Sequence, residues 1–588
     1  MESSLRKLCC VGRSLALVLV VALNVTAQSQ PDESPTTTTG TITGQVLTDT
    51  GQPVVGAAVS VRAYGGTGQG RVTTTDSQGN FQVSGLDPLS YIVSAFASAF
   101  VPAQRDPDST QSPYYRVGDS VKIQLIRGGV ITGSVTTSAD EPVVGVRVRA
   151  YMIRDSSGRS SRYGTPFREK VTDDRGIYRI YGLLAGTYLV SAGGSGNLSG
   201  VNTNPYETDT PTYAPSSPRD TAMEVSVSPG AEVSNVDIHY RGEPGRIISG
   251  SAIDSTGAAA GTFTIYLSPI SNGVSQWSHS TYQPSGMQGF SFYGLADGDY
   301  NIVAQTYFPT GEFALSEPRL IKLKGADITG VELAVKPLAS ITGRVALEES
   351  KVPECQGKRR PVFAETLITP WHNEKNISKD QPQFSWSLGS PTFPDKQGDF
   401  TLRNLAPGQY RFHTRPFAKY WYLQSISLRS AVAPPRRGVQ TSRSVDAARN
   451  WVTVKSGDRV SGLTITLAAG AASLKGQIKT SEAEKLPPRL FVYLVPAETD
   501  RAEDVLRYFV SPVAADGSFA LNNLPPGRYF TITKTAGDNE SSMLSKLRLP
   551  DESEGRAKLR QEGASAKIET ELKPCQNVTD YQLALKPR

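Results

Sequence analysis

Short stretches of alternating apolar and polar residues recur along the chain from about residue 40 onward. One example runs from Ile42 to Val46 (ITGQV), where apolar side chains are separated by an even number of positions. Because successive side chains of a β-strand point to opposite faces, this period of two predicts strands with one buried face. Turn-forming residues separate the stretches about every 8 to 12 positions, which is typical of β-sandwiches.

One unit built from such stretches occurs five times. Each copy opens with a strand that contains a glycine, at Gly44, Gly133, Gly250, Gly343 and Gly476. An aromatic residue, a leucine and a tyrosine then follow at nearly fixed distances, as in Phe400, Leu405 and Tyr410. A second alternating strand closes each copy. Repetition of one unit at this scale predicts tandem domains of the same fold.

The centre of the unit predicts a β-hairpin. In the fourth copy Asp395 and Gly398 predict a tight turn, because aspartate bonds the nearby backbone and glycine accepts a positive φ. Phe400 lies in the strand that follows, and Leu405 ends that strand. A Pro-Gly pair then reverses the chain, and Tyr410 lies in the return strand. The third copy lacks the aspartate, so we expect a different turn there.

Five domains follow from these repeats. We place them at residues 41–127, 128–242, 243–338, 339–470 and 471–588. The joints between them are only a few residues long, so we expect a semi-rigid string. The fourth domain carries long inserts at 346–395 and 414–450, and short helices are expected at 500–508 and within 541–562.

The N-terminal segment predicts export. A basic start is followed by an apolar run from Leu15 to Leu23 and by small residues up to Ala27. This is the pattern of a Sec-type signal peptide, residues 1–27, cleaved between Ala27 and Gln28. The alternative is a signal anchor that stays in the membrane, although the run is short for a bilayer core of about 30 Å. Residues 28–40 are polar and are expected to form a disordered linker.

Charge and composition narrow the function classes. The 588 residues include 61 basic and 55 acidic side chains, a net charge of +6. Because these charges nearly balance, we expect no nucleic-acid binding driven by bulk charge. Four histidines and four cysteines leave little material for a metal site, and no cofactor is expected. No later run of about 18 apolar residues occurs, so no membrane span is expected after signal cleavage.

The first copy resembles a known family. Its opening ITGQV is followed by Gly51 to Val59 (GQPVVGAAV) and by Thr75 to Leu86 (TDSQGNFQVSGL). These motifs resemble the carboxypeptidase regulatory-like domain, which occurs in arrays in secreted bacterial proteins of the Acidobacteria type. The resemblance extends, most weakly in the third copy, over nearly all of residues 41–588. It implies an all-β chain of about five prealbumin-like Greek-key sandwiches, the fold of transthyretin, collagen-adhesin B repeats and starch-binding modules.

The family name prompts a test for peptidase chemistry. A zinc carboxypeptidase site needs a His-x-x-Glu pair and a distant histidine. None of His239, His279, His372 and His413 has a glutamate three residues later. The G-x-S-x-G and G-x-x-x-x-G-K-[ST] motifs are also absent from the sequence. We therefore expect no catalytic and no metal-binding residues; the alternative is a hydrolase site built by the fourth-domain inserts.

Two cysteines remain after signal cleavage. Cys355 lies early in the fourth domain and Cys575 near the end of the fifth. In an exported protein such a pair suggests a disulfide, here one that would link two domains. The alternative is two separate buried thiols.

Trp277, Trp386 and Trp421 are the candidate carbohydrate-binding residues, because sugar-binding sandwiches stack sugar rings on exposed aromatic side chains. Alternation along the strand places Trp421 on the face opposite to Tyr420 and Tyr422, so the three rings cannot form one platform. The alternative is that these tryptophans fill an enlarged core.

Together these features predict a non-catalytic, secreted or periplasmic protein with a structural or binding role. Its expected partner is a polysaccharide or a surface protein, and the carbohydrate version rests partly on the starch-binding-like fold that the resemblance implies. Cell-surface adhesion and an accessory role in an outer-membrane uptake system are the alternatives, because this fold supports many functions.

Overall fold

The computed structural model describes residues 39–585 apart from internal gaps. The gaps are residues 65–69, 88, 104–113, 157, 159–167, 195–203, 255–260, 272–273, 276–278, 287–288, 309–310, 374–388, 417, 430–443, 480–485, 488, 515 and 536–546. The predicted signal peptide lies outside the described residues, and so do Trp277 and Trp386. Most of the predicted linker lies outside as well, and the first strand begins at its last residue, Gly40.

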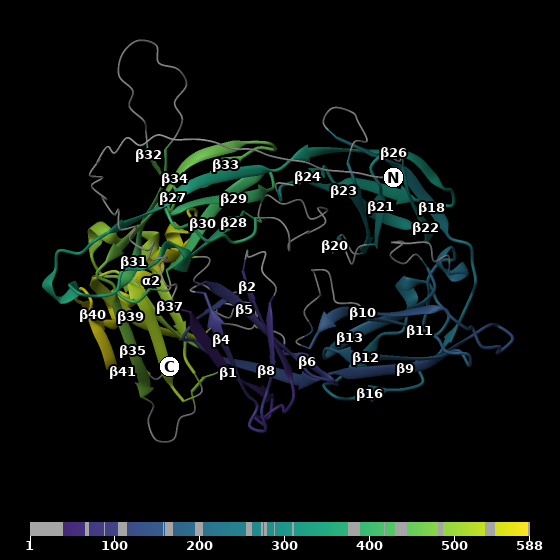
Figure 1. The fold of residues 1–588 in the computed structure, drawn as a ribbon, viewed down its shortest axis with the longest axis horizontal. Coiled ribbons are helices and arrows are strands. Elements are labelled where there is room, and N and C mark those ends of the chain that lie inside the picture. Colours follow the sequence, from purple (N-terminus) through teal and green to yellow (C-terminus); the bar gives the residue numbers. More distant parts are fainter. Residues whose placement is uncertain are drawn as a thin grey trace, which may run out of the picture.

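The chain is all-β, as predicted (Figure 1). In the first sandwich, the sheet β4-β1-β8-β6 faces the sheet β3-β2-β5-β7 across one hydrophobic core. Its strands are β1 (Gly40–Thr48), β2 (Ala58–Ala63), β3 (Arg71–Thr74), β4 (Asn80–Leu86), β5 (Ser90–Phe96), β6 (Phe100–Pro102), β7 (Tyr114–Arg116) and β8 (Ser120–Arg127). The opening strand β1 pairs antiparallel with β4 and parallel with the closing strand β8.

The second sandwich repeats this plan with extra short strands. Its sheets are β11-β10-β13-β14, with β15 beside β13, and β12-β9-β16, with β17 beside β9. The strands are β9 (Gly129–Thr136), β10 (Arg147–Asp155), β11 (Arg168–Val171), β12 (Ile177–Leu183), β13 (Gly186–Ala192), β14 (Thr212–Tyr213), β15 (Val225–Val227), β16 (Glu232–Val233) and β17 (Ile238–His239). Two 3-10 turns, Pro205–Glu207 and Arg219–Thr221, lie between them.

The third sandwich departs from the two-sheet plan. Strand β24 pairs with both β23 and β26, so the strands of both layers join into one continuous sheet that encloses the core. Its strands are β18 (Arg246–Ile253), β19 (Phe263–Ser271), β20 (Val274–Ser275), β21 (His279–Gln283), β22 (Phe290–Leu295), β23 (Gly298–Tyr307), β24 (Phe313–Ser316), β25 (Arg319–Leu323) and β26 (Ile328–Pro337). This is the copy whose sequence matches the repeat least.

The fourth sandwich has the sheets β29-β27-β34-β31-β32 and β28-β30-β33. Its strands are β27 (Ala339–Glu348), β28 (Thr366–His372), β29 (Asp399–Leu405), β30 (Gly408–Pro416), β31 (Trp421–Arg429), β32 (Ser444–Asp446), β33 (Val452–Val454) and β34 (Arg459–Ala469). Two 3-10 turns, Pro353–Cys355 and Phe363–Glu365, lie between β27 and β28.

The fifth sandwich has the sheets β38-β35-β41 and β37-β36-β39-β40. Its strands are β35 (Ala472–Lys479), β36 (Leu490–Pro496), β37 (Phe509–Pro512), β38 (Ser518–Leu524), β39 (Gly527–Thr535), β40 (Glu569–Leu572) and β41 (Asn577–Ala584). The helix α2 (Ser553–Ala566) packs on β36 and β39 and overlaps the end of the second predicted helix. The first predicted helix is wrong, because residues 499–501 and 505–507 form two separate 3-10 turns.

A close strand contact explains the glycine of each opening strand. A Cβ at Gly44 would lie 2.1 Å from the Val121 carbonyl oxygen and 2.6 Å from the Phe81 ring. At Gly476 the corresponding distances are 2.3 Å to the Tyr581 oxygen and 2.7 Å to the Phe519 ring. The motif therefore pairs a glycine with an aromatic residue on the neighbouring strand because the ring packs in the space that a side chain would fill.

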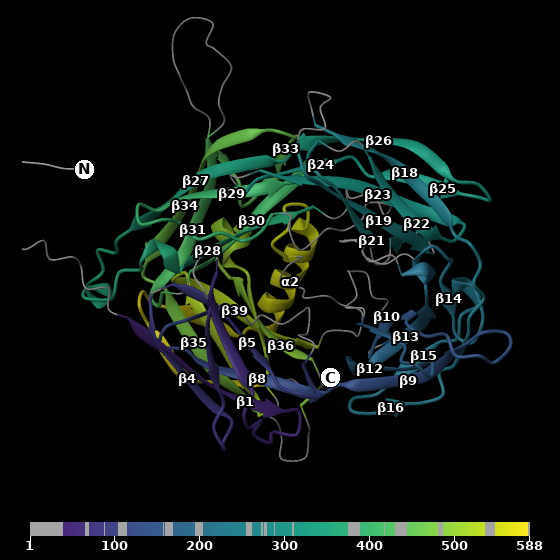
Figure 2. The same cartoon turned by 45° about the vertical axis from the view of Figure 1, so that its right-hand side comes forward.

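The five sandwiches do not form an open string. In Figures 1 and 2 the chain turns through a closed circuit, so that the first sandwich (purple) lies beside the fourth and fifth (green and yellow). Direct contacts between residues of the first and fourth domains support this arrangement. In the described part of the chain, no helix has the length and apolar character needed to cross a membrane.

Candidate functional site

Consecutive domains contact each other near one position of the repeat, at the end of its central strand. The residue before the last leucine of the central strand has a positive φ in every copy, at Gly85, Gly182, Gly294, Asn404 and Asn523. This backbone bulge of the second and third domains packs against a linker glycine. For example, a Cβ at Gly128 would lie 2.9 Å from the Gly182 Cα atom. In the second and third domains the bulge therefore lies directly against the segment that joins the domain to the preceding one.

The fourth and fifth domains replace the bulge glycine with asparagine, which tolerates a left-handed conformation. The amide of Asn404 accepts a hydrogen bond from the Phe313 N–H (2.8 Å) of the third domain. The amide of Asn523 donates to the carbonyl oxygens of Ala418 (2.8 Å) and Trp421 (2.7 Å) of the fourth. The two asparagines therefore add specific hydrogen bonds to the joint.

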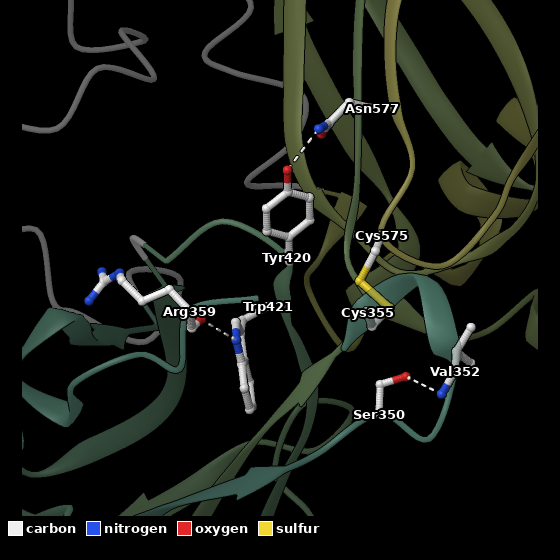
Figure 3. The surroundings of a disulfide bond; sticks show 8 residues. All are labelled: Ser350, Val352, Cys355, Arg359, Tyr420, Trp421, Cys575 and Asn577. Atoms are coloured by element: carbon white, nitrogen blue, oxygen red, sulfur yellow. Dashed lines mark hydrogen bonds between the residues drawn. A yellow bond between two sulfur atoms is a disulfide. The ribbon is translucent and has the colours of Figure 1, made fainter. Parts of the chain in front are cut away.

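A disulfide between Cys355 and Cys575 also joins the fourth and fifth domains, with their Cα atoms 5.4 Å apart (Figure 3). The short linker is held as well, because the N–H of Ala471 donates to the Tyr420 carbonyl (2.9 Å) and the N–H of Cys575 donates to the Gly470 carbonyl (3.0 Å). Covalent and hydrogen bonds therefore hold these two domains in one relative position.

Trp421 is not a surface platform. Its side chain is 2% exposed and belongs to the core of the fourth sandwich, and its indole N–H donates to the Arg359 carbonyl (3.2 Å; Figure 3). The structure therefore corrects the carbohydrate-binding expectation for this residue, because a buried ring offers no face to a sugar. Trp371, 43% exposed on β28, presents more surface, although the guanidinium of Arg411 lies 4.6 Å from its ring centre.

Aromatic rings connect the first domain to the fourth. The rings of Tyr64 and Tyr114 meet edge-to-face at 4.7 Å, and Phe393 of the fourth domain packs against them at 5.7 Å and 6.2 Å. The Tyr64 hydroxyl donates to the Pro391 carbonyl (3.0 Å). Edge-to-face aromatic pairs each contribute about 0.5–1.5 kcal/mol beyond the area they bury, so this cluster stabilises the circuit.

An ion pair also connects the first domain to the fourth. A guanidinium nitrogen of Arg116, at the end of β7, lies 3.5 Å from a carboxylate oxygen of Glu365 in the fourth domain. The same Glu365 oxygen pairs with Arg359 at 2.5 Å. Its side chain is 13% exposed, so these pairs are less screened by solvent than ordinary surface pairs.

A cleft of about 740 Å³ lies where the first, fourth and fifth domains meet. Described residues from all three domains line it: Tyr114, Tyr115, Arg116, Asp119, Ser120, Lys122, Arg415, Pro416, Lys419, Tyr420, Ala471, Ala472, Ser473, Lys475, Asn522, Asn523, Asn577 and Thr579. This volume is within the range of about 300–1,000 Å³ that is typical of small-molecule sites. The cleft is the candidate functional site of the protein.

Strand β30 carries a row of basic residues, of which Arg415 lines the cleft. Arg411, His413 and Arg415 alternate along β30 and therefore share the face opposite to the core residues of that strand. Burial lowers the pKa of His413, and together with the nearby charges of Arg548, Arg411 and Arg415 it brings this pKa to about 3. Burial also lowers the pKa of Arg415, and the charge of Arg116 adds to this effect. His413 is therefore neutral near neutral pH.

The described residues give no support to a metal or hydrolase site. No cluster of three histidine, cysteine, aspartate or glutamate side chains within them is arranged to hold a metal ion. A second hollow, in the fourth domain, contains Asp395 and Asp399. Asp395 accepts hydrogen bonds from its own turn, and the hydrogen bond with Arg344 lowers the pKa of Asp399, so both carboxylates have structural partners.

Sequence reasoning did not find the residues of the cleft. Arg116 and Arg415 are about 300 positions apart, and no motif marks either residue. The available signal was the short linkers, which imply close domain contacts without showing which domains meet.

Comparison with known proteins supports the family expectation. Residues 41–113 match the family model of the carboxypeptidase regulatory-like domain. The sequence-based resemblance is thus confirmed for the first domain, and the structure confirms an array of β-sandwiches. No curated protein matches the sequence.

Several solved structures align with parts of the chain. The Bacillus anthracis TIE protein matches with 14% identity and a TM-score of 0.14, over 51% of each chain. A streptococcal ancillary pilin matches with 12% identity and a TM-score of 0.16, over 51% of this chain and 99% of the pilin. The major pilin subunit of Bacillus cereus matches with 11% identity and a TM-score of 0.13, over 51% and 99%. No functional conclusion follows from TM-scores of this size.

Proposed function

We propose that this protein is exported and works as a non-catalytic scaffold, which holds five β-sandwiches in a closed circuit and binds a polysaccharide or a surface protein. The observation that carries the proposal is the junction of the first, fourth and fifth domains. There an aromatic cluster fixes the first domain against the fourth, and a disulfide and hydrogen bonds fix the fourth domain against the fifth. Structural disulfides persist in oxidising compartments, which supports a location outside the cytoplasm.

A polysaccharide is the more specific of the two proposed partners. The buried Trp421 does not support it, so the support comes from the cleft, where tyrosines and amide side chains lie together. Sites that bind small ligands combine ring surfaces with a few placed polar groups.

The test uses the full chain, expressed with its own N-terminus in a bacterium that has a periplasm. Mass spectrometry of the exported protein should find an N-terminus at Gln28 and, without reduction, a peptide pair joined through Cys355 and Cys575. Small-angle scattering should give the dimensions of the closed circuit. A cytoplasmic product with reduced cysteines, or the scattering of an extended chain, would contradict the proposal.

A further inference from the structure

The cleft between the first, fourth and fifth domains has a strong excess of positive charge. Lys122 comes from the first domain, Lys419 and Arg415 come from the fourth, and Lys475 comes from the fifth. Among the described residues that line the cleft, the one carboxylate is Asp119, which accepts a hydrogen bond from the Arg116 backbone N–H (2.8 Å). The remainder of the chain is nearly balanced in charge, so this excess is a local property.

The polar groups of the cleft are fixed before any ligand binds. The Asn577 amide donates to the Tyr420 hydroxyl (2.9 Å; Figure 3) and accepts from the Ser473 hydroxyl (2.8 Å). The Asn523 amide is held by two carbonyl oxygens of the fourth domain. Groups that are already ordered lose little conformational entropy when a ligand binds, so such a site gains affinity.

The combination of side chains identifies the class of ligand. Lysine and arginine pair with carboxylates, asparagine and serine bond hydroxyl groups, and tyrosine rings pack against the C–H faces of sugars. Tyr114, Tyr115 and Tyr420 also line the cleft, with neighbours covering part of each ring: Phe393, the core of the first domain and Lys358, respectively. A neutral glucan would offer no charge partner to the exposed lysines of the cleft, and an apolar ligand would also offer no polar group to its amides. An acidic sugar chain satisfies all three kinds of group.

We propose that this three-domain cleft binds an acidic oligosaccharide, with its carboxylates against the lysine and arginine side chains and its rings against the tyrosines. The inference rests on the proposed function, because the cleft exists only while the circuit is closed. Its residues come from domains far apart in the sequence, so an isolated domain should not bind the ligand.

The experiment measures binding of oligogalacturonate to the full-length protein by isothermal calorimetry at low and at physiological salt. Neutral malto-oligosaccharides, a single-stranded oligonucleotide and inorganic phosphate serve as competing probes. We expect oligogalacturonate to bind best, with an affinity that falls as salt screens the charges. No binding of oligogalacturonate, or tighter binding of one of the other probes, would overturn the proposal.

Charge-reversal variants test whether the ligand binds in the cleft. Lys419→Glu with Lys475→Glu changes two exposed cleft lysines and should weaken oligogalacturonate binding at least about tenfold, the size expected when charge-assisted hydrogen bonds are lost. Lys322→Glu with Lys324→Glu makes the same charge change on exposed lysines of the third domain and should change the affinity less than about twofold. Equal losses in the two variants would contradict a cleft site.

Small-angle scattering distinguishes failure of the scaffold function from failure of the ligand proposal. Small-angle scattering of each variant reports whether the circuit stays closed, independently of the ligand. A closed circuit without oligogalacturonate binding would overturn the ligand class and leave the scaffold function standing. An open circuit in the unmodified protein would overturn both. As a second variant, Lys122→Glu tests the cleft from the first domain and should also weaken binding.

Discussion

Removal of the Cys355–Cys575 bond should destabilise the fifth domain selectively. The bond spans 220 positions, but the relevant loop is shorter when the fifth domain unfolds while the fourth stays folded. The chain leaves the fourth domain after Ala469 and returns to it at Cys575, so the bond closes a loop of about 100 residues. Chain-entropy estimates assign about 4.7 kcal/mol to a loop of that length, and typical measured values are about 2–4 kcal/mol.

Differential scanning calorimetry of the full chain measures this effect. In the double variant Cys355→Ser, Cys575→Ser, the transition of the fifth domain should move down by roughly 10–20 °C. The other transitions should stay within a few degrees, because their domains unfold without opening this loop. Hydrogen exchange on β39 and β41 identifies which transition belongs to the fifth domain.

Each single variant is the matched control. Cys355→Ser and Cys575→Ser both break the bond and should each give the shift of the double variant, whereas loss of side-chain packing alone would give different shifts at the two positions. If the fifth domain unfolds at the same temperature with and without the bond, the reasoning from loop closure is refuted.

Three further predictions each concern one residue. Gly44→Ala should destabilise the first domain by about 1–3 kcal/mol, because the new Cβ would meet the Val121 carbonyl at 2.1 Å; urea unfolding followed by circular dichroism checks this value. Asn523→Gly keeps the left-handed backbone but removes two hydrogen bonds to the fourth domain, so it should cost about 1–3 kcal/mol in the calorimetric transition of the fifth domain; an unchanged transition would contradict the joint described above. The pKa of His413 is about 3 in the folded protein, against an ordinary value of 6.5. Between these two pH values only the unfolded chain binds this proton. The free energy of unfolding should therefore fall as the pH falls through that range. His413→Gln should remove the part of this pH dependence that corresponds to the uptake of about one proton. Urea unfolding of both proteins at pH 6.5 and 4.5 measures the change. If stability changes equally with pH in the two proteins, the proton does not belong to His413 and the prediction is refuted.

The strands and turns of the repeat could be predicted from the sequence because their causes are local. Alternation selects the buried face of β4, where Phe81 and Val83 lie in the core. Asp76 accepts the backbone N–H groups of Gln78 and Asn80, as an aspartate in a tight turn does. These interactions join residues that are only a few positions apart, so short motifs contain the information.

The helices and the tryptophan were harder to predict because their surroundings decide them. Residues 499–507 contain helix-favouring side chains, yet they form separate 3-10 turns beside the fifth sandwich. For Trp421, alternation predicted a face opposite to the tyrosines but not which face is covered. The position of β31 within its sheet turns the indole into the core, where the Arg359 carbonyl satisfies its N–H.

By itself the sequence determined the repeat and the all-β fold, since each follows from a period within one domain. Only the tertiary structure decided that the first domain meets the fourth and fifth, because the orientation of each domain relative to the next is set at four short joints and no local motif specifies it. The cleft arises from that closure. Its residues, such as Arg116 and Lys475, lie in different domains, and no local pattern relates them.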